Sequence, residues 1–260
     1  MAKSSSGCIK IRMDGEVGWL IISNPDYRNA MNLSMYQQIP KAVSTLLSAH
    51  VRVIVVRGHG EEAFGAGSDI SEFLTLRKPE NARTYDEAEA LAHSHIEHAP
   101  VPTIAMIQGP CRGGGLAIAL ACDLRYASSD ATFAAPPAKL GIGFPHSAVT
   151  SLTQIIGDAN ARRLLLTAAT IDATEAMSIG IVHAITDRIS LVNTIDEITT
   201  GICQLSPRSL NAAKTSLANL KGQRSSNDVQ DAISRCYTSN DYQEGIMAFL
   251  EKRSPDFDGT

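Results

Sequence analysis

The sequence predicts a mixed α/β domain followed by a helical C-terminal region. The order of the expected elements and the size and composition of the chain support this prediction. Short β-prone runs alternate with helical stretches up to about residue 158, after which the pattern turns mostly helical. Alternation of this kind implies a mostly parallel sheet. The chain has 260 residues and is 44% hydrophobic, which is enough for a sizeable core. We expect a core at residues 1–200 and a helical region at 201–260.

The first expected elements are a hairpin and a helix. The β-prone runs at residues 9–12 and 17–23 flank the turn signal Asp14-Gly15, a pattern typical of a β-hairpin. Ser34 can cap a helix that runs to about Ala49.

Two strands and a polar helix are expected next. Residues 51–57 form a β-branched run followed by glycine, as in a buried strand. A polar helix is expected at 79–98, because Pro100 and Pro102 end it. Residues 101–107 indicate the next strand.

A glycine turn then introduces an apolar segment. Gly113-Gly114-Gly115 precedes residues 116–122, which can form a buried helix, and a strand is expected at 124–128. Later in the chain only 182–185 has the pattern of a strand. Residues 206–250 predict several helices in series.

Composition excludes several classes of function. The formal net charge is −4 and the basic residues are dispersed, which gives no footprint for nucleic acid. The N-terminal residues lack the apolar run of a signal peptide, and the longest apolar stretch is too short to span a membrane. The five cysteines are scattered and odd in number, which indicates reduced thiols. We therefore expect a cytoplasmic protein without nucleic-acid or membrane partners.

Four groups of motifs occur in a fixed order along nearly the whole chain. They are NPDYRNAMN at 24–32, VIVVRGHGEEAFGAGSDI at 53–70, IAMIQGPCRGGGLAIALACDLRYAS at 104–128, and ATFAAPPAKLGIGFP at 131–145 with EGIMAFLEKRSPDF at 244–257. Together they resemble the crotonase (enoyl-CoA hydratase/isomerase) superfamily. The resemblance implies a spiral of ββα units, a helical C-terminal trimerisation region at 201–260, and a homotrimer or homohexamer that binds an acyl-CoA substrate.

The glycine motifs suit enolate chemistry. A thioester carbonyl that becomes an enolate needs two hydrogen-bond donors aimed at the developing charge, and backbone amides at a glycine turn and a helix start can supply them. Gly114, at the expected helix start, fits one role. The resemblance implies the amide of Ser68 as its partner, so that the two form an oxyanion hole. The alternative is that these glycines only permit tight turns.

The resemblance also implies a set of CoA contacts. Coenzyme A would be part of the substrate, and no tightly bound cofactor is expected. The groups implied to hold its adenine and pantetheine lie near Arg28, Ala30, Ala66, Asp69 and Ile70. Lys252, in the FLEKR string, is implied to meet the CoA phosphates from a neighbouring subunit.

The chain departs from the family pattern at two catalytic positions. Hydratases of the family use two glutamates to activate water, and those positions hold Ala117 and Pro137 here. Neither side chain can transfer a proton. Candidate replacements are His146, Ser71 and Glu72. The imidazole of His146 suits proton transfer near neutral pH, although capping a helix is an equally good interpretation.

Three other patterns are interpreted as decoys. Gly65-Ala66-Gly67-Ser68 suggests a serine nucleophile, but the elbow G-x-S-x-G needs a glycine where Ile70 stands, so Ser68 is expected to lend its amide and not its hydroxyl. Residues 58–63, GHGEEA, imitate a dinucleotide-binding fingerprint, but Gly65 and Gly67 follow at once and would break the helix that this motif must open. His93, His95 and His98 with Glu97 offer possible metal ligands. Because the helix is polar, we expect these side chains to be solvated, and we predict no metal site.

Three functions remain open at this point. The first is an acyl-CoA lyase or isomerase that acts through an enolate. The second is a decarboxylase of a malonyl-type CoA, although the tyrosine expected in its later loop is Phe144 here. The third is a catalytically silent acyl-CoA-binding protein.

Overall fold

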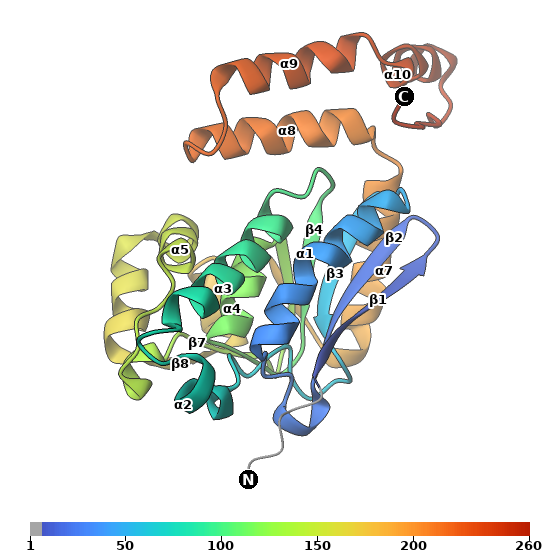
Figure 1. Cartoon of the computed structure of the whole chain (residues 1–260). Coiled ribbons are helices and arrows are strands. Elements are labelled where there is room, and N and C mark those ends of the chain that lie inside the picture. Colours follow the sequence, from blue (N-terminus) through green and yellow to red (C-terminus); the bar gives the residue numbers. More distant parts are fainter. Residues whose placement is uncertain (1–6) are drawn as a thin grey trace. The chain divides into compact units, whose positions relative to one another are not determined.

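The computed structural model describes residues 7–260 and consists of two compact units (Figure 1). The first contains the chain up to Ala99 together with Thr103–Ile195, and the second contains Pro100–Pro102 and Asp196–Thr260. Helix α7 (Arg188–Cys203) includes the point of division. The expected division of roles between residues 1–200 and 201–260 stays a prediction.

A six-stranded sheet lies at the centre of the first unit. Its strands in spatial order are β1 (Cys8–Asp14), β2 (Val17–Ser23), β3 (Val53–Gly58), β4 (Thr103–Ile107), β6 (Leu124–Ser128) and β9 (Ala184–Thr186). The hairpin β1–β2 is antiparallel, and every other neighbouring pair is parallel. All five residues of β4 are buried, as is usual in a parallel strand covered on both faces. The predicted mixed α/β fold with a mostly parallel sheet is confirmed.

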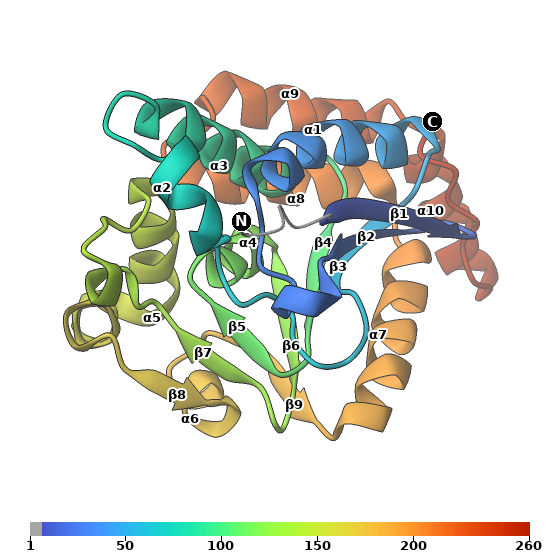
Figure 2. The ribbon, with the colours of Figure 1, turned by 60° about the horizontal axis from the view of Figure 1, so that its bottom comes forward.

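A second, three-stranded sheet was not predicted. It consists of β5 (Pro110–Arg112), β7 (Thr132–Ala134) and β8 (Thr170–Asp172), and Figure 2 shows these strands together. Each strand has three residues, which is too short for an alternating pattern to be recognised. Strand β5 sets the position of the glycine turn that follows it.

The helices of the first unit connect and cover these strands. They are α1 (Leu33–Ser48), α2 (Phe73–Leu76), α3 (Ala82–Glu97), α4 (Gly114–Ala121), α5 (His146–Thr167) and α6 (Ala173–Ser178). The start of α4 at Gly114 agrees with the sequence. The cap of α1 does not, since the side chain of Asn32, and not of Ser34, accepts a hydrogen bond from the amide of Met35 at 2.9 Å.

Helix α3 is polar in composition, yet it buries one face beside α1 (Figure 1). The expectation that its histidines are all solvated is wrong for His93, which is 5% exposed and meets the edge of the Tyr36 ring. Buried positions at Tyr85, Glu89, His93 and Ile96 recur every three or four residues, so they share a face. Within residues 7–260 no three potential ligands cluster closely enough to hold a metal ion.

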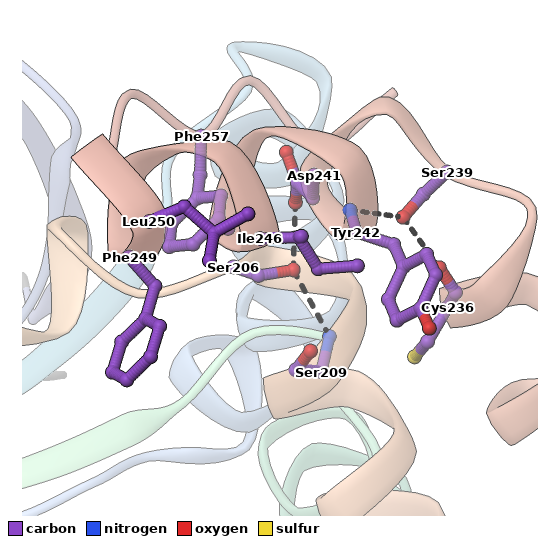
Figure 3. Close-up of a pocket in the computed structure, with 11 residues that line it drawn as sticks. Ser206, Ser209, Cys236, Ser239, Asp241, Tyr242, Ile246, Phe249, Leu250 and Phe257 are labelled. Carbon is purple, nitrogen blue, oxygen red and sulfur yellow. Dashed lines mark hydrogen bonds between the residues drawn. The ribbon is translucent and has the colours of Figure 1, made fainter.

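The second unit contains three helices in series, as the sequence predicts. They are α8 (Pro207–Leu220), α9 (Ser226–Tyr237) and α10 (Asn240–Glu251). Ser206, Ser225 and Ser239 cap their N-termini. Figure 3 shows an apolar hollow in this unit, beside which Ser206 and Asp241 are hydrogen-bonded. None of the helices in the described part of the chain has both the length and the apolarity that a membrane crossing requires.

Candidate active site

The loop at residues 65–69 is held on both sides by backbone hydrogen bonds. On one side the amide of Gly65 donates to the carbonyl of Pro110 at 3.1 Å, and the amide of Arg112 donates to the carbonyl of Gly65 at 2.9 Å. On the other side the amide of Met31 donates to the carbonyl of Gly67 at 2.8 Å. The loop is therefore fixed between β5 and the 28–31 segment.

Glycine is required where this loop meets the 113–115 turn. A Cβ on Gly115 would lie 2.5 Å from the carbonyl oxygen of Gly65, far inside van der Waals contact. Gly67 has φ of +116° and Gly113 has φ of +50°, a region that favours glycine. These glycines let the backbones of the two segments approach closely. This supports the interpretation that the glycines permit tight turns, and it is compatible with a role of the amides in binding.

The amides of Ser68 and Gly114 both belong to residues that line one pocket, which has a volume of about 120 Å³. Ser68 lies in the 65–69 loop, and Gly114 is the first residue of α4. Within residues 7–260 neither amide donates a hydrogen bond to a protein acceptor. Two unpaired backbone donors, one at the positive end of a helix, form a site that suits an anionic oxygen.

The rest of the pocket wall is mainly apolar. It comes from Phe73 and Arg77 in and after α2, and from the segment between Pro136 and Pro145. Among the described lining residues, Arg77 alone has an ionisable side chain. Pro137 and Phe144 belong to the lining, whereas Ala117 is buried inside α4. No aspartate or glutamate of the described chain belongs to the lining itself.

The residues expected to hold CoA fall into two groups. Arg28, Ala30, Ala66, Asp69 and Ile70 lie in the two segments that the loop hydrogen bonds join, where the amide of Ala66 donates to the carbonyl of Arg28 at 3.0 Å. Ala66 and Ile70 line the pocket. Lys252 belongs to the second unit, where it ends α10 in a left-handed conformation with φ of +56°.

The three expected proton-transfer candidates lie outside the pocket lining, and the side chains of Ser71 and Glu72 form hydrogen bonds within the protein. His146 is exposed at the start of α5 and outside the pocket lining. The hydroxyl of Ser71 donates to the Asp69 carboxylate at 2.7 Å. The carboxylate of Glu72 accepts from the amide of Leu33 at 2.8 Å. None of the three side chains lines the pocket.

A polar network behind Ser68 was missed by the sequence. The Ser68 hydroxyl donates to the Glu89 carboxylate at 2.8 Å and lies 3.0 Å from the Tyr36 hydroxyl. The second carboxylate oxygen of Glu89 accepts from the Arg77 guanidinium at 3.1 Å. Burial raises the pKa of Glu89, although Arg77 and Ser68 oppose this. The spacing of the buried face of α3 was the one sequence signal that could have singled out Glu89.

Comparisons with known proteins point to one enzyme family. A family profile described as Enoyl-CoA hydratase/isomerase matches residues 12–260. A crotonyl-CoA hydratase of Syntrophomonas wolfei is 31% identical, covering 96% of this chain and 97% of its own. A methylmalonyl-CoA decarboxylase of Escherichia coli is 30% identical, covering 89% and 90%.

Solved structures show the same fold. An enoyl-CoA hydratase/carnithine racemase of Magnetospirillum magneticum superposes with a TM-score of 0.92 at 30% identity, covering 97% of this chain and 96% of its own. An enoyl-CoA hydratase/isomerase family protein of Hyphomonas neptunium gives a TM-score of 0.93 at 29% identity, covering 99% and 100%. These likenesses confirm the crotonase-type fold expected from the motifs.

Proposed function

The chain belongs to the enoyl-CoA hydratase/isomerase family, and from this premise we propose that it acts on an acyl-CoA thioester as a lyase or isomerase. Coenzyme A enters as part of the substrate, with no tightly bound cofactor. The observation that carries the proposal is the pair of unpaired amides, Ser68 and Gly114, in one pocket.

The two amides act as an oxyanion hole. They would donate to the thioester oxygen, whose negative charge grows as the enolate forms. Because the 65–69 loop is fixed by hydrogen bonds to β5 and to Met31, the donors need no rearrangement when the charge develops. One such donor is typically worth about 10²–10³-fold in turnover.

The remainder of the substrate follows the exposed side of the same loops. Arg28, Ala30, Ala66, Asp69 and Ile70 contact the adenine and pantetheine in this proposal, and Lys252 contacts the CoA phosphates from a neighbouring subunit. Ala66 and Ile70 line the pocket, and the hydrogen bond from the Ala66 amide to the Arg28 carbonyl joins their loop to the 28–31 segment, which supports this part of the proposal.

Hydration is expected to be slow. Adding water to an enoyl thioester needs one group that accepts a proton from water and another that protonates the α-carbon, and such assistance is worth about 10²–10⁴-fold. Pro137 in the pocket wall and Ala117 inside α4 supply neither. Isomerisation through an enolate therefore fits the pocket better than hydration does.

Decarboxylation of a malonyl-type CoA is the second candidate. Its support is the Arg77 guanidinium in the pocket wall, since a cation there favours a substrate carboxylate. The 30% identity to a methylmalonyl-CoA decarboxylase points the same way. Phe144 lines the pocket but offers no hydroxyl.

A panel of CoA thioesters tests these proposals. Crotonyl-CoA, trans-3-hexenoyl-CoA and methylmalonyl-CoA would be assayed for turnover, with binding of each measured by calorimetry. We expect all three to bind and trans-3-hexenoyl-CoA to be converted fastest. Binding without any turnover would leave a silent acyl-CoA-binding protein, and absence of binding would refute the acyl-CoA proposal altogether.

A further inference from the structure

Glu89 is a buried carboxylate for which the proposed chemistry has so far no use. Its side chain is 3% exposed and faces the back of the oxyanion loop from α3. Burying a carboxylate is costly unless it is paired and hydrogen-bonded. Here Ser68 and Arg77 both donate to it. The side chain thus lies directly behind a residue that lines the pocket.

The Ser68 hydroxyl connects that carboxylate to a residue of the pocket wall. Its Oγ is 3.1 Å from the position that a Cβ on Gly114 would occupy. Its residue also lines the substrate pocket. The hydroxyl thus belongs to a residue that supplies one of the two proposed oxyanion-hole amides and lies close to the residue that supplies the other.

We propose that the Ser68 hydroxyl and Glu89 together form the proton-transfer group of the site, and that it moves a proton between the α- and γ-carbons of a bound 3-enoyl thioester. This inference rests on the proposed function and names the group that performs it. Ser68 contacts the substrate, and Glu89 acts through Ser68.

The proposed step balances without any further reactant. The α C–H bond breaks, and its proton passes to Ser68 Oγ while the hydroxyl proton of Ser68 passes to Glu89. The electron pair of that bond forms a dienolate, whose oxygen is held by the two amides. The Ser68 proton then passes to the γ-carbon while Glu89 returns its proton to Ser68 Oγ, which shifts the double bond into conjugation with the thioester. A proton that exchanges with D₂O while the dienolate is bound appears as deuterium in the product.

A single carboxylate suits this reaction class. Isomerisation needs one group that removes a proton and returns it, whereas hydration needs two groups on the substrate. The described pocket lining has no acidic side chain of its own, so the Ser68–Glu89 pair is the available route. The absence of the glutamate pair and the presence of Glu89 behind Ser68 both favour isomerisation.

Opposing influences act on the Glu89 carboxylate. Arg77 beside Oε2 favours the carboxylate, and Asp86 shares that guanidinium at 2.6 Å. Tyr36 from α1 and Tyr85 from α3 also face the carboxylate. Burial is the largest influence and raises the pKa of Glu89, which strengthens the base.

The experiment follows trans-3-hexenoyl-CoA in the full-length protein, by its conversion to the conjugated isomer and by deuterium uptake at its α- and γ-carbons in D₂O. The variants are Glu89→Gln and Ser68→Ala. Glu87→Gln is the matched control, because Glu87 lies in the same helix, is exposed and pairs with Arg83. Circular dichroism and calorimetric binding of the same thioester accompany each variant.

We expect Glu89→Gln and Ser68→Ala each to lower kcat by about 10²–10⁴-fold with binding retained, and Glu87→Gln to leave it unchanged. The acidic limb of the wild-type pH profile should disappear in whatever activity Glu89→Gln retains, which a purely structural role would not produce. If Ser68→Ala stays folded and turns over at the wild-type rate, the inference is overturned.

The same measurements distinguish failure of this inference from failure of the proposed function. Wild-type protein that binds the thioester but neither forms the conjugated isomer nor exchanges deuterium would refute the proton-transfer group and leave acyl-CoA binding intact. Wild-type protein that binds no thioester would refute the proposed function itself. A normal rate of conversion in Glu89→Gln would refute the inference alone.

Discussion

Gly114 shows at the scale of one residue how closely the site is packed. A Cβ at this position would lie 2.1 Å from the Tyr36 hydroxyl oxygen and 3.1 Å from Ser68 Oγ. The absence of a side chain at Gly114 is therefore what allows Tyr36 to reach Ser68. Any substitution at Gly114 disturbs the network as well as the amide.

This packing gives a prediction for a pair of substitutions. Gly114→Ala should lower the free energy of unfolding by about 1–3 kcal/mol, because the new methyl group overlaps the Tyr36 hydroxyl. In Tyr36→Phe that oxygen is gone and the nearest ring atom is 3.4 Å away. The double variant should therefore lose less stability than the two single losses combined, by about 1 kcal/mol in a urea-unfolding cycle. Simple additivity would contradict this account.

His93 provides a pH-dependent contribution to stability. Burial lowers the pKa of His93 from 6.5 to about 4, and its Nε2 atom has no hydrogen-bond partner among residues 7–260. Between these pH values the unfolded chain binds a proton that the folded chain does not. The free energy of unfolding should therefore fall as the pH drops from 6.5 to 4, by about 3 kcal/mol from this group.

Urea unfolding of the wild type and of His93→Phe at pH 7 and pH 4 measures that contribution. The variant keeps an aromatic ring beside Tyr36 and has no group to protonate, so its loss of stability on acidification should be smaller by the same amount. An equal loss in both proteins would show that His93 does not carry the effect.

At the scale of elements, the C-terminal segment is tied to α10 by one carboxylate. Asp241 is 4% exposed, and it accepts hydrogen bonds from the Ser206 hydroxyl and from the amides of Asp258 and Gly259. One side chain thus joins the start of α8, the start of α10 and the final residues. Its removal leaves the Ser206 hydroxyl and the two amides without this acceptor.

Asp241→Ala should therefore release the last residues of the chain. We expect faster amide hydrogen exchange at Asp258 and Gly259, and a lower unfolding temperature, with a cost of about 1–3 kcal/mol for the lost acceptor. Asp231→Ala is the control, because Asp231 is exposed on α9. Unchanged exchange in Asp241→Ala would mean that other contacts hold the segment.

The sequence predicted elements best where their patterns are long. The hairpin, the buried strands and the glycine turn before α4 all have strong local signals. Strands β5, β7 and β8 have three residues each and pair with partners far along the chain, so no local pattern reveals them. Glu89 was missed for a related reason: its partner Ser68 is 21 residues away, and only the fold brings them together.

At the scale of the whole molecule, the family resemblance predicts a trimer or a dimer of trimers. The second unit carries large apolar side chains that are well exposed, including Tyr237, Phe249 and Leu250 at 64%, 81% and 69%. Exposed apolar groups of this size favour association. Sedimentation equilibrium should give three or six times the chain mass of 27.8 kDa. Phe249→Asp should shift the protein towards the monomer.

A mass of 27.8 kDa for the wild type at micromolar concentration would contradict this prediction. An unchanged assembly in Phe249→Asp would place the association on another surface. The oligomeric state was expected from the family motifs, because the structure of a single chain does not show which surfaces contact another subunit.

The separation of Phe73 and Arg77 from the glycine turn has a consequence for how this scaffold diversifies. The amides belong to a backbone arrangement that tolerates almost no side chain, as the 2.5 Å approach at Gly115 shows. Phe73 and Arg77 instead lie in and just after α2, a four-residue helix in a largely exposed connection. Mutational drift or directed evolution can therefore remodel the selectivity of the pocket through α2, while the electrophile-activating part is inherited unchanged.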